Sequence, residues 1–344
     1  MRFRTGYTRH TFMYLCMAAA AGCGALGGPA TSDHVPNAGV TGWHLLPSNS
    51  QTEIQEPFVF CPPGGARAPA VVRGGSGVVW RLWYVTADGA VGGATSSDGL
   101  YDWVDDGPLA LAGGPWSDVS VARDGEIWRL AAATSDGSRI SIFGSVDGAA
   151  WAPVASLAAT EPWEAGRVGG PALLADPISG GWILFHEGAR RGAIGAATSA
   201  DGETWVDSSE PILTPATIAA STEWSVLSLG APSAAIDTSR PGPAVYKLWF
   251  EAKELRHGRT PSLSESADVV GFAGSFDGVT WQAFAGNPVF QQRLVTIPNA
   301  PPVFTPTREP SVVATGASWR MYFEDPFDNG TAPVRACVAV AVTP

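Results

Sequence analysis

The chain is poor in charged residues. Only 15% of its 344 residues are charged, and 21 Lys and Arg stand against 32 Asp and Glu, which gives a formal net charge of −11. Nucleic-acid affinity comes mainly from Lys and Arg that neutralise phosphates, so this balance argues against a nucleic-acid partner. No long amphipathic helical stretch is evident. The 41 Gly, 28 Pro and 14 Trp instead favour many short strands separated by turns.

The sequence also lacks the motifs of several kinds of chemistry. It contains no P-loop, no Gly-x-Ser-x-Gly elbow and no dinucleotide fingerprint. Its five histidines lack the spacing of metal ligands. We therefore expect no cofactor and no metal.

Cysteine is scarce, with four residues in the whole chain. Cys16 and Cys23 lie in the N-terminal segment, so the folded domain keeps only Cys61 and Cys337. In an oxidising compartment these two either pair or remain two buried thiols, and the sequence leaves both alternatives open.

The N-terminus is typical of a targeting segment. Arg2, Arg4 and Arg9 form a basic region, and the apolar run at residues 11–21 is too short to span a bilayer. The run ends in Ala-Ala-Gly-Cys23, which resembles the lipobox of bacterial lipoproteins. We predict a signal peptide over residues 1–22, lipidation of Cys23 and a flexible tether over residues 23–40, with ordinary secretion as the alternative.

Four copies of one short pattern organise the rest of the chain. Ser-x-Asp-Gly begins at Ser96, Ser145, Ser199 and Ser275, and a tryptophan follows each copy: Trp103, Trp151, Trp205 and Trp281. Asp-Gly between two alternating apolar runs predicts a tight type I′ turn between antiparallel strands, because that turn needs positive φ at both central residues. Recurrence at about 50 residues is typical of a propeller.

An aromatic run precedes each copy, and a segment of small residues precedes each aromatic run. The aromatic runs begin at Trp80, Trp128, Trp182, Tyr246 and Trp319, and the small-residue segments lie around Ala68, Asp118, Gly170, Ala231 and Glu309. This alignment predicts an all-β, five-bladed propeller of four-stranded antiparallel blades over residues 41–344. The fifth unit lacks an outer strand, and we predict that residues 42–60 supply it and so remove an open sheet edge near Cys61 and Cys337.

The aromatic strands and the Ser-x-Asp-Gly-x-x-Trp hairpins resemble those of the five-bladed propeller glycosidases, the arabinanase, xylosidase and invertase-like group. The hairpins also resemble the Asp-box of sialidases, which lies away from the active site. This resemblance implies that the turn aspartates and tryptophans are structural.

The same resemblance implies that catalytic carboxylates lie at the entrances of the inner strands of three consecutive blades. Asp118, in Trp116-Ser-Asp-Val, matches the carboxylate that orients the substrate and tunes the acid. The base position matches Ala68 and the acid position matches Gly169, so two of the three roles have no carboxylate there. Hydrolysis needs both an acid and a base or nucleophile.

Other carboxylates are candidates for the missing roles. Glu309 enters the fifth blade before a proline, and further acidic residues lie at the ends of second strands, which return to the same face. The candidate catalytic residues are Asp118, Glu309 and Glu187, and the candidate substrate-binding residues are Trp116, His186, Glu251 and Glu324. The alternative is that these side chains form hydrogen bonds that close neighbouring blades, and that His186 is structural.

Three functional hypotheses follow. The first is an extracytoplasmic, lipid-anchored or secreted propeller that binds carbohydrate in its axial pocket, with an incomplete set of residues for hydrolysis. The second is an active glycoside hydrolase with a rearranged carboxylate pair, and the third is a non-catalytic scaffold that binds protein. We expect a monomer that contacts a membrane only through its lipid anchor.

Overall fold

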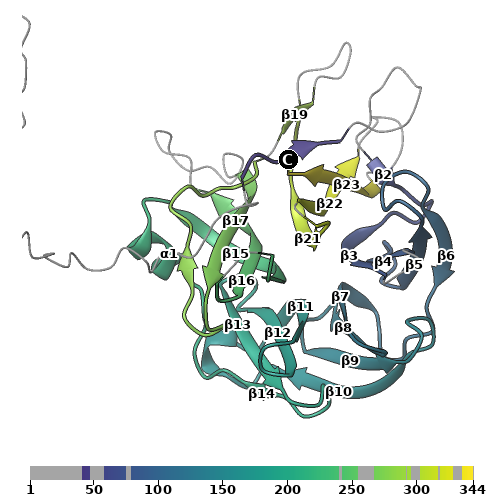
Figure 1. Ribbon diagram of the computed structural model, residues 1–344, viewed down its shortest axis with the longest axis horizontal. Helices are drawn as coiled ribbons and strands as arrows, with labels where there is room; N and C mark the ends of the chain where they lie inside the picture. Colours follow the sequence, from purple (N-terminus) through teal and green to yellow (C-terminus); the bar gives the residue numbers. More distant parts are fainter. Residues whose placement is uncertain are drawn as a thin grey trace, which may run out of the picture. The chain divides into compact units, whose positions relative to one another are not determined.

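Five antiparallel sheets surround a central axis in the computed structural model (Figure 1). The structure describes residues 41–46, 58–74, 79–239, 242–254, 267–291, 293–295, 303–316, 318–327 and 335–343. The predicted signal peptide, Cys23 and the tether lie outside these residues. Among the described residues, no helix is long and apolar enough to cross a membrane. The fold confirms the predicted five-bladed propeller.

Four blades have four strands each. Blade 1 contains β3 (Arg67–Arg73), β4 (Trp80–Val85), β5 (Val91–Ser96) and β6 (Val104–Pro108). Blade 2 contains β7 (Trp116–Asp124), β8 (Ile127–Thr134), β9 (Arg139–Ser145) and β10 (Ala152–Ala158). Blade 3 contains β11 (Val168–Asp176), β12 (Gly181–Gly188), β13 (Ala193–Ser199) and β14 (Val206–Asp207). Blade 4 contains β15 (Val226–Asp237), β16 (Val245–Glu254), β17 (Ala267–Ser275) and β18 (Gln282–Ala283).

The fifth blade is completed by strands from the other end of the domain. Its own strands are β21 (Arg308–Ala314), β22 (Trp319–Phe327) and β23 (Arg335–Val342). Both β1 (His44–Leu45) and β2 (Phe58–Phe60) pair antiparallel with β23, which confirms the predicted closure. Cys61 follows β2 and forms a disulfide with Cys337 of β23, with their Cα atoms 4.6 Å apart. A covalent bond therefore joins the two strands that close the ring.

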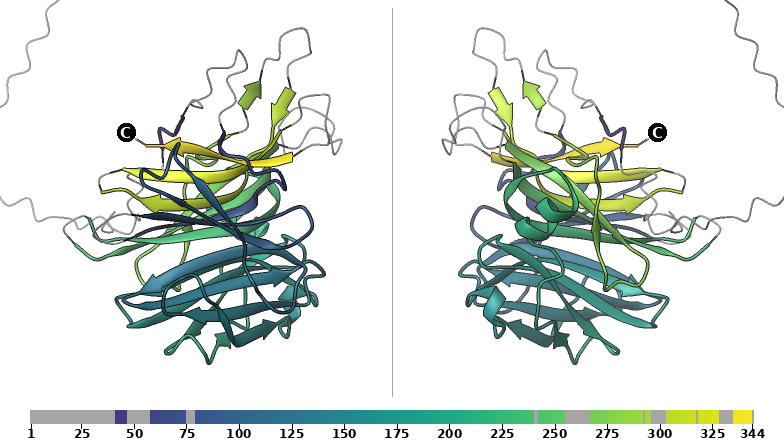
Figure 2. Two further views of the ribbon diagram at one scale, coloured as in Figure 1. Left: turned by 90° about the vertical axis from the view of Figure 1, so that its right-hand side faces the viewer. Right: turned by 90° about the vertical axis from the view of Figure 1, so that its left-hand side faces the viewer.

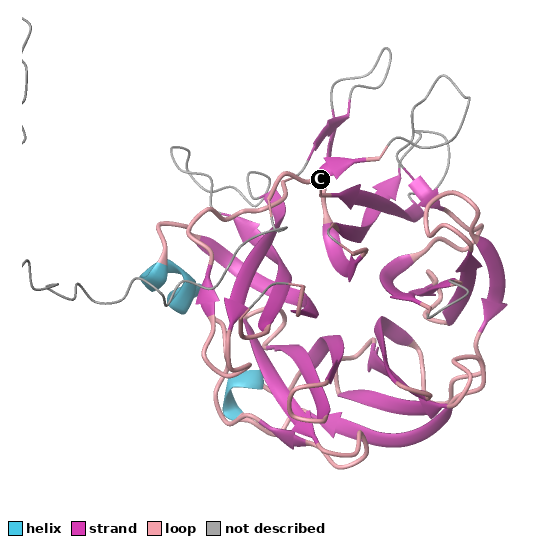
Figure 3. Ribbon diagram, in the orientation of Figure 1, coloured by secondary structure: helices cyan, strands magenta, loops and turns pink. Residues whose placement is uncertain are grey.

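The links between blades carry the few other elements. A short helix η2 (Pro162–Glu164) precedes blade 3 and α1 (Pro215–Ser221) precedes blade 4, and both lie at the periphery (Figure 3). The hairpin of β19 (Arg293–Val295) and β20 (Val303–Thr305) projects beyond the sheet of blade 5 (Figure 2). None of these elements interrupts the central ring of inner strands.

Aromatic side chains pack between neighbouring blades. Trp83 of blade 1 lies 5.8 Å from Trp128 of blade 2 between ring centroids, and Trp249 of blade 4 lies 5.2 Å from Trp319 of blade 5. All four tryptophans are at most 6% exposed. Because aromatic pairs bury large areas, these contacts hold adjacent sheets together around the axis.

The Ser-x-Asp-Gly segments are not type I′ turns, so that part of the prediction is wrong. Between β9 and β10, the backbone N–H of Gly148 donates to Ser145 Oγ at 2.9 Å. The N–H groups of Ala149 and Ala150 donate to Asp147 Oδ1 at 2.8 and 2.9 Å. Gly148 has φ 69°, while Asp147 is not among the residues with positive φ. The side chains thus build a longer loop by accepting backbone donors, which a two-residue turn does not require.

Candidate functional site

Four of the five inner strands contain the same backbone irregularity. The residues Ala68, Gly170, Ala231 and Glu309 each precede a proline, and their φ values are 46°, 47°, 41° and 51°. The pairing with the second strand shifts register at each of these places. Left-handed backbone is unfavourable for residues with a Cβ, so the bulge stores strain. Of these four residues, Glu309 alone brings a functional group to the entrance.

A guanidinium lies among three glutamates at this end of the axis. Arg191 belongs to the loop between β12 and β13, in which Ala189, Arg190 and Arg191 have φ values of 52°, 55° and 67°. Its Nε lies 3.7 Å from Glu187 Oε2, and its Nη2 lies 3.5 Å from Glu309 Oε1. Its Nη1 pairs with Glu251 Oε1. Each nitrogen therefore faces a carboxylate of a different blade. We use the name axial mouth for the group formed by Asp118, Glu187, Arg191, Glu251 and Glu309.

The same glutamates also link neighbouring blades. The N–H of Ala231 donates to Glu187 Oε2 at 3.0 Å, and the N–H of Glu309 donates to Glu251 Oε2 at 3.2 Å. The N–H of Ala68 donates to Glu309 Oε2 at 2.7 Å. Each bond joins one blade to the next, as the structural alternative for these residues requires. Blade closure and a cluster of charge at the axis are therefore properties of the same side chains.

Two of these carboxylates lie beside the positions at which the sequence lacks one. Glu309 Oε2 accepts the backbone hydrogen bond from Ala68, the predicted base position. A Cβ at Gly169, the predicted acid position, would lie 3.2 Å from Glu187 Oε1. The carboxylate of Glu309 thus comes from the neighbouring blade to lie beside Ala68. The carboxylate of Glu187 comes from the neighbouring strand to lie beside Gly169.

Two cavities open at the axial mouth, and Asp118 lines both. The larger has a volume of about 250 Å³ and is also lined by Glu187, Arg167, Arg190 and Arg191. The smaller, of about 30 Å³, lies at the axis between Asp118, Ala68 and Glu309. Ser117 Oγ donates a hydrogen bond to Asp118 Oδ2 and orients that carboxylate. Asp118 and Glu187 therefore share the wall of one polar cavity.

Burial at the mouth favours the protonated form of the glutamates. Burial raises the pKa of Glu187 to about 7, with Arg191 opposing the shift and the charge of Asp118 adding to it. Burial, Glu324 and Asp118 raise the pKa of Glu309 well above its usual range, against the opposing charge of Arg191. Burial also raises the pKa of Glu251. A carboxyl group that exchanges its proton near neutral pH is suited to acid–base chemistry.

The other predicted site residues lie in packed surroundings. His186 is fully buried and stacks on Trp163 with 5.3 Å between ring centroids. It neighbours Glu187 in β12, so its side chain points to the opposite face of the sheet. Trp116 is 2% exposed and meets Phe143 edge-on at 5.8 Å. Glu324 is 7% exposed and acts on Glu309 through its charge. Because His186 and Trp116 are both buried, neither side chain is accessible to a sugar.

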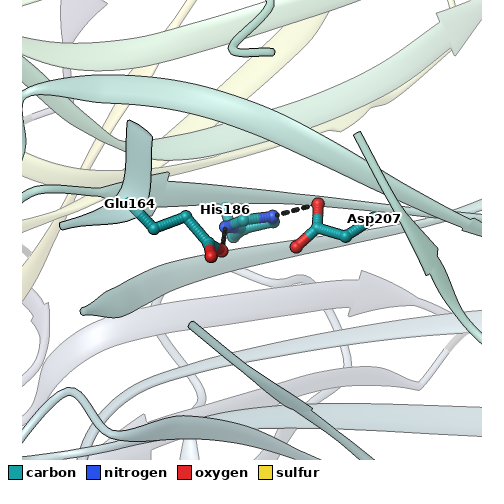
Figure 4. Close-up of side chains that lie close together, drawn as sticks. All are labelled: Glu164, His186 and Asp207. Atoms are coloured by element: carbon teal, nitrogen blue, oxygen red, sulfur yellow. Dashed lines mark hydrogen bonds and ion pairs between the residues drawn. The ribbon is translucent and has the colours of Figure 1, made fainter. Parts of the chain in front are cut away.

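His186 lies between two carboxylates (Figure 4). Its Nε2 is 3.1 Å from Asp207 Oδ1, and its Nδ1 is 3.9 Å from Glu164 Oε1. One ligand atom from each of the three residues lies within 4.8 Å of the others, so the group could hold a metal ion. The two ring nitrogens, however, face different carboxylates: Nε2 is hydrogen bonded to Asp207 of β14, while Nδ1 lies beside Glu164 of η2 without a hydrogen bond.

Sequence reasoning did not single out Arg191, although it brings the glutamates together. The available signal was the pair Arg190-Arg191 directly after Glu187-Gly188-Ala189, in a chain with few cationic residues. The pattern did not show that the loop bends back over the axis. That direction depends on three consecutive left-handed residues, which only the backbone shows.

Comparison with known proteins identifies the class of fold. The chain resembles the solved structure of a putative glycoside hydrolase from Parabacteroides distasonis ATCC 8503, with a TM-score of 0.57, 16% identity and coverage of 88% of this chain and 96% of that one. This protein therefore has the fold of the five-bladed β-propeller glycoside hydrolases.

Two particular enzymes of this fold are also similar. The α-L-arabinofuranosidase Arb93A from Fusarium graminearum gives a TM-score of 0.53 at 12% identity, covering 83% of this chain and 96% of that one. The Bacillus subtilis arabinanase Arb43A gives 0.53 at 11% identity with the same two coverages, 83% and 96%. No family model and no curated protein matches the chain.

Proposed function

We propose that this protein binds carbohydrate at the axial mouth. The observation that carries the proposal is the polar cavity of about 250 Å³ whose wall includes the carboxylates of Asp118 and Glu187 beside Arg191. Carboxylates accept hydrogen bonds from sugar hydroxyls, and guanidinium groups donate to hydroxyl oxygens. Drug-sized ligands occupy sites of roughly 300–1,000 Å³, so this cavity suits a sugar unit rather than a long segment.

The polar lining also separates this proposal from the scaffold hypothesis. A vestigial axis plugged by apolar side chains would favour protein binding. The axial mouth instead holds four acidic groups and one arginine, which come from inner strands, second strands and the loop of Arg191. These groups already have partners in neighbouring blades, so the support for recognition comes from the polar cavity that Asp118 and Glu187 line.

A second candidate function is glycoside hydrolysis, and the raised pKa of Glu187 favours it. With a pKa of about 7, Glu187 retains a proton over part of the neutral range and would protonate the leaving oxygen. Asp118 lines the same cavity and would serve as the base. This assignment places both carboxylates in the lining of one cavity, and inverting and retaining hydrolysis each require a pair of carboxylates at the scissile bond.

Calorimetric titration with neutral oligosaccharides and turnover of aryl glycosides test both functions. We expect Asp118→Asn and Glu187→Gln each to weaken sugar binding by about 10-fold or more, because a hydrogen bond to a charged group contributes roughly 1.5–3 kcal/mol. Glu126→Gln is the matched control, since Glu126 is exposed at the far end of β7 and β8. If none of the sugars in the panel binds, the result contradicts the first function.

The pH profile separates hydrolysis from binding alone. If Glu187 is the acid, the wild-type rate falls as the pH rises through about 7, because the carboxyl group loses its proton. Glu187→Gln then abolishes turnover. Turnover that Asp118→Asn and Glu187→Gln both leave unchanged removes these residues from the mechanism.

We also propose that the protein is exported and anchored through a lipid on Cys23. The basic residues before an apolar run support this localisation. The disulfide between Cys61 and Cys337 supports it too, because such bonds persist in oxidising compartments. Mass spectrometry of the membrane-extracted protein should find an acylated N-terminal Cys23, and Cys23→Ser should move the protein to the soluble fraction. An unprocessed or unmodified N-terminus contradicts the anchor.

A further inference from the structure

The larger cavity at the axial mouth is rich in arginine. Its lining includes Arg167, Arg190 and Arg191, against the acidic residues Asp118 and Glu187. The chain as a whole carries a formal charge of −11. A local excess of cationic side chains on an acidic protein marks this cavity as different from the rest of the molecule, and it points to a ligand with negative charge.

The charge of Arg191 is already matched, but the charges of the other two arginines are not. Arg191 pairs with Glu187, Glu251 and Glu309. Within the part of the chain that the structure describes, no ion pair or side-chain hydrogen bond engages Arg167 or Arg190. Arg190 is exposed to solvent and Arg167 is half-buried. Their ten guanidinium N–H donors, five on each, are therefore available to a ligand.

The backbone holds Arg167 at the cavity. The N–H of Arg167 donates to the carbonyl oxygen of Glu164 at 3.1 Å, and the N–H of Val168 donates to that of Gly137 at 3.0 Å. Gly137, with φ 72°, makes room for the guanidinium, because a Cβ there would lie 2.9 Å from Arg167 Nη2. The guanidinium of Arg167 thus packs against the turn at Gly137, and both residues line the cavity.

We propose that the cavity recognises an acidic carbohydrate, with Arg167 and Arg190 binding the anionic group of the sugar. This inference rests on the proposed carbohydrate binding and specifies its substrate class. Planar guanidinium groups match the two oxygens of a carboxylate or the oxygens of a sulfate ester, and such charge-assisted bonds are roughly twice as strong as neutral ones. Asp118 and Glu187 accept hydrogen bonds from the hydroxyls of the same sugar ring.

Matched pairs of ligands test the proposal by calorimetric titration of the folded domain. The pairs are oligosaccharides of galacturonic acid and galactose, of glucuronic acid and glucose, and of mannuronic acid and mannose, with a sulfated galactose oligosaccharide as a separate arm. We expect the wild type to bind at least one acidic member about 10-fold more tightly than its neutral partner. The sulfated arm shows whether the anionic group is a carboxylate or a sulfate.

The double variant Arg167→Gln, Arg190→Gln should lose this preference while it keeps its affinity for the neutral member within about 2-fold. Retained neutral binding shows that the variant is folded. Arg123→Gln is the matched control, because Arg123 carries the same charge at the other end of β7 and should leave the preference unchanged. Raising the salt concentration should weaken binding of the acidic member by the wild type and leave the neutral member almost unaffected.

The outcomes distinguish this inference from the proposed function. Equal binding of acidic and neutral members overturns the inference and leaves carbohydrate binding intact. Binding of no member overturns both. An acidic preference that survives in the double variant, or that salt does not weaken, also overturns the assignment to Arg167 and Arg190.

Discussion

Acidic side chains perform opposite tasks in two regions of this propeller. In the Ser-x-Asp-Gly loops, which we call the rim, each aspartate accepts backbone hydrogen bonds from its own loop, and these bonds lower the pKa of Asp147, Asp201 and Asp277 to about 2. At the axial mouth, burial raises the pKa of Glu187 to about 7 and that of Glu309 well above its usual range. The same functional group is held charged in one place and close to protonation in the other.

The difference arises from the surroundings of each carboxylate. The rim aspartates are exposed and have two or more N–H donors each, which stabilise the ionised form. The mouth glutamates are buried beside other acids and share a single guanidinium. The repeated acidic motif therefore has a structural role in this protein. The carboxylates suited to acid–base chemistry are the glutamates of the mouth, which come from different blades.

The largest expected effect comes from removing the shared cation with Arg191→Met. Three glutamates then lose their counter-charge, and we expect a loss of about 2–4 kcal/mol in the free energy of unfolding at pH 8, slightly less than for a fully buried pair because Arg191 is 32% exposed. The loss should shrink at pH 5, where the glutamates take up protons. Urea denaturation of the wild type and the variant at pH 8 and pH 5 measures this loss in the free energy of unfolding.

Arg123→Met provides the control for this prediction. Arg123 pairs with the exposed Glu126 at 3.3 Å, and surface pairs of this kind contribute about 0–1 kcal/mol. An equal loss in the two variants would erase the distinction between the buried cluster at the mouth and an exposed ion pair.

The next effect concerns the pH dependence of stability in Glu187→Gln. The folded pKa of Glu187, about 7, lies above the ordinary value of 4.5, so between these values the folded protein holds a proton that the unfolded chain has lost. The contribution of this proton to stability is full below about pH 4.5 and disappears as the pH rises through 7. We expect the variant to lose less stability than the wild type between pH 5 and pH 8.

Denaturant midpoints measured across that interval check this prediction, with Glu126→Gln as the control that keeps the wild-type slope. Parallel curves for the wild type and Glu187→Gln would mean that Glu187 ionises normally in the folded protein. In that case its assignment as the acid of a hydrolase also fails.

The smallest effect is expected at the rim, in Asp277→Ala. Asp277 Oδ1 accepts the N–H groups of Thr280 and Val279 at 2.7 and 2.8 Å, so its loss should cost about 1 kcal/mol. Asp277→Asn keeps a carbonyl acceptor and should cost less. Thermal denaturation at pH 7 measures both, and ligand binding should not change in either variant. A change in sugar affinity would contradict a purely structural role for the loop.

Much of the fold could be predicted because each blade repeats the same local pattern. The aromatic run of β4, β8, β12, β16 and β22 and the acidic turns set the register of the strands, and the missing last strand indicated closure from the N-terminal side. The turn type was wrong because the Asp-Gly pair alone does not show that Ser145 and Asp147 accept backbone donors across a longer loop. Local residue preference was correct, but side-chain hydrogen bonding decided the geometry.

The site was predictable only in part. Asp118, Glu187, Glu251 and Glu309 were candidates because of their places at strand ends, and these four do gather at the axial mouth. His186 was a candidate for the same reason, but its place next to Glu187 in β12 turns it to the other face and buries it. Arg191 had no signal of this kind, because its position depends on the path of a loop.

The sequence by itself determined the repeat, the number of blades and the absence of carboxylates at Ala68 and Gly169, since these depend on residue identity and spacing. Only the tertiary structure decided that Glu309 and Glu187 lie beside those two positions and that Arg191 joins them to Glu251. The physical reason is twofold: closing the ring brings blade 5 against blade 1, and three consecutive left-handed residues turn the Arg191 loop toward the axis. Residues 241 positions apart in the chain, Ala68 and Glu309, thereby come within hydrogen-bonding distance.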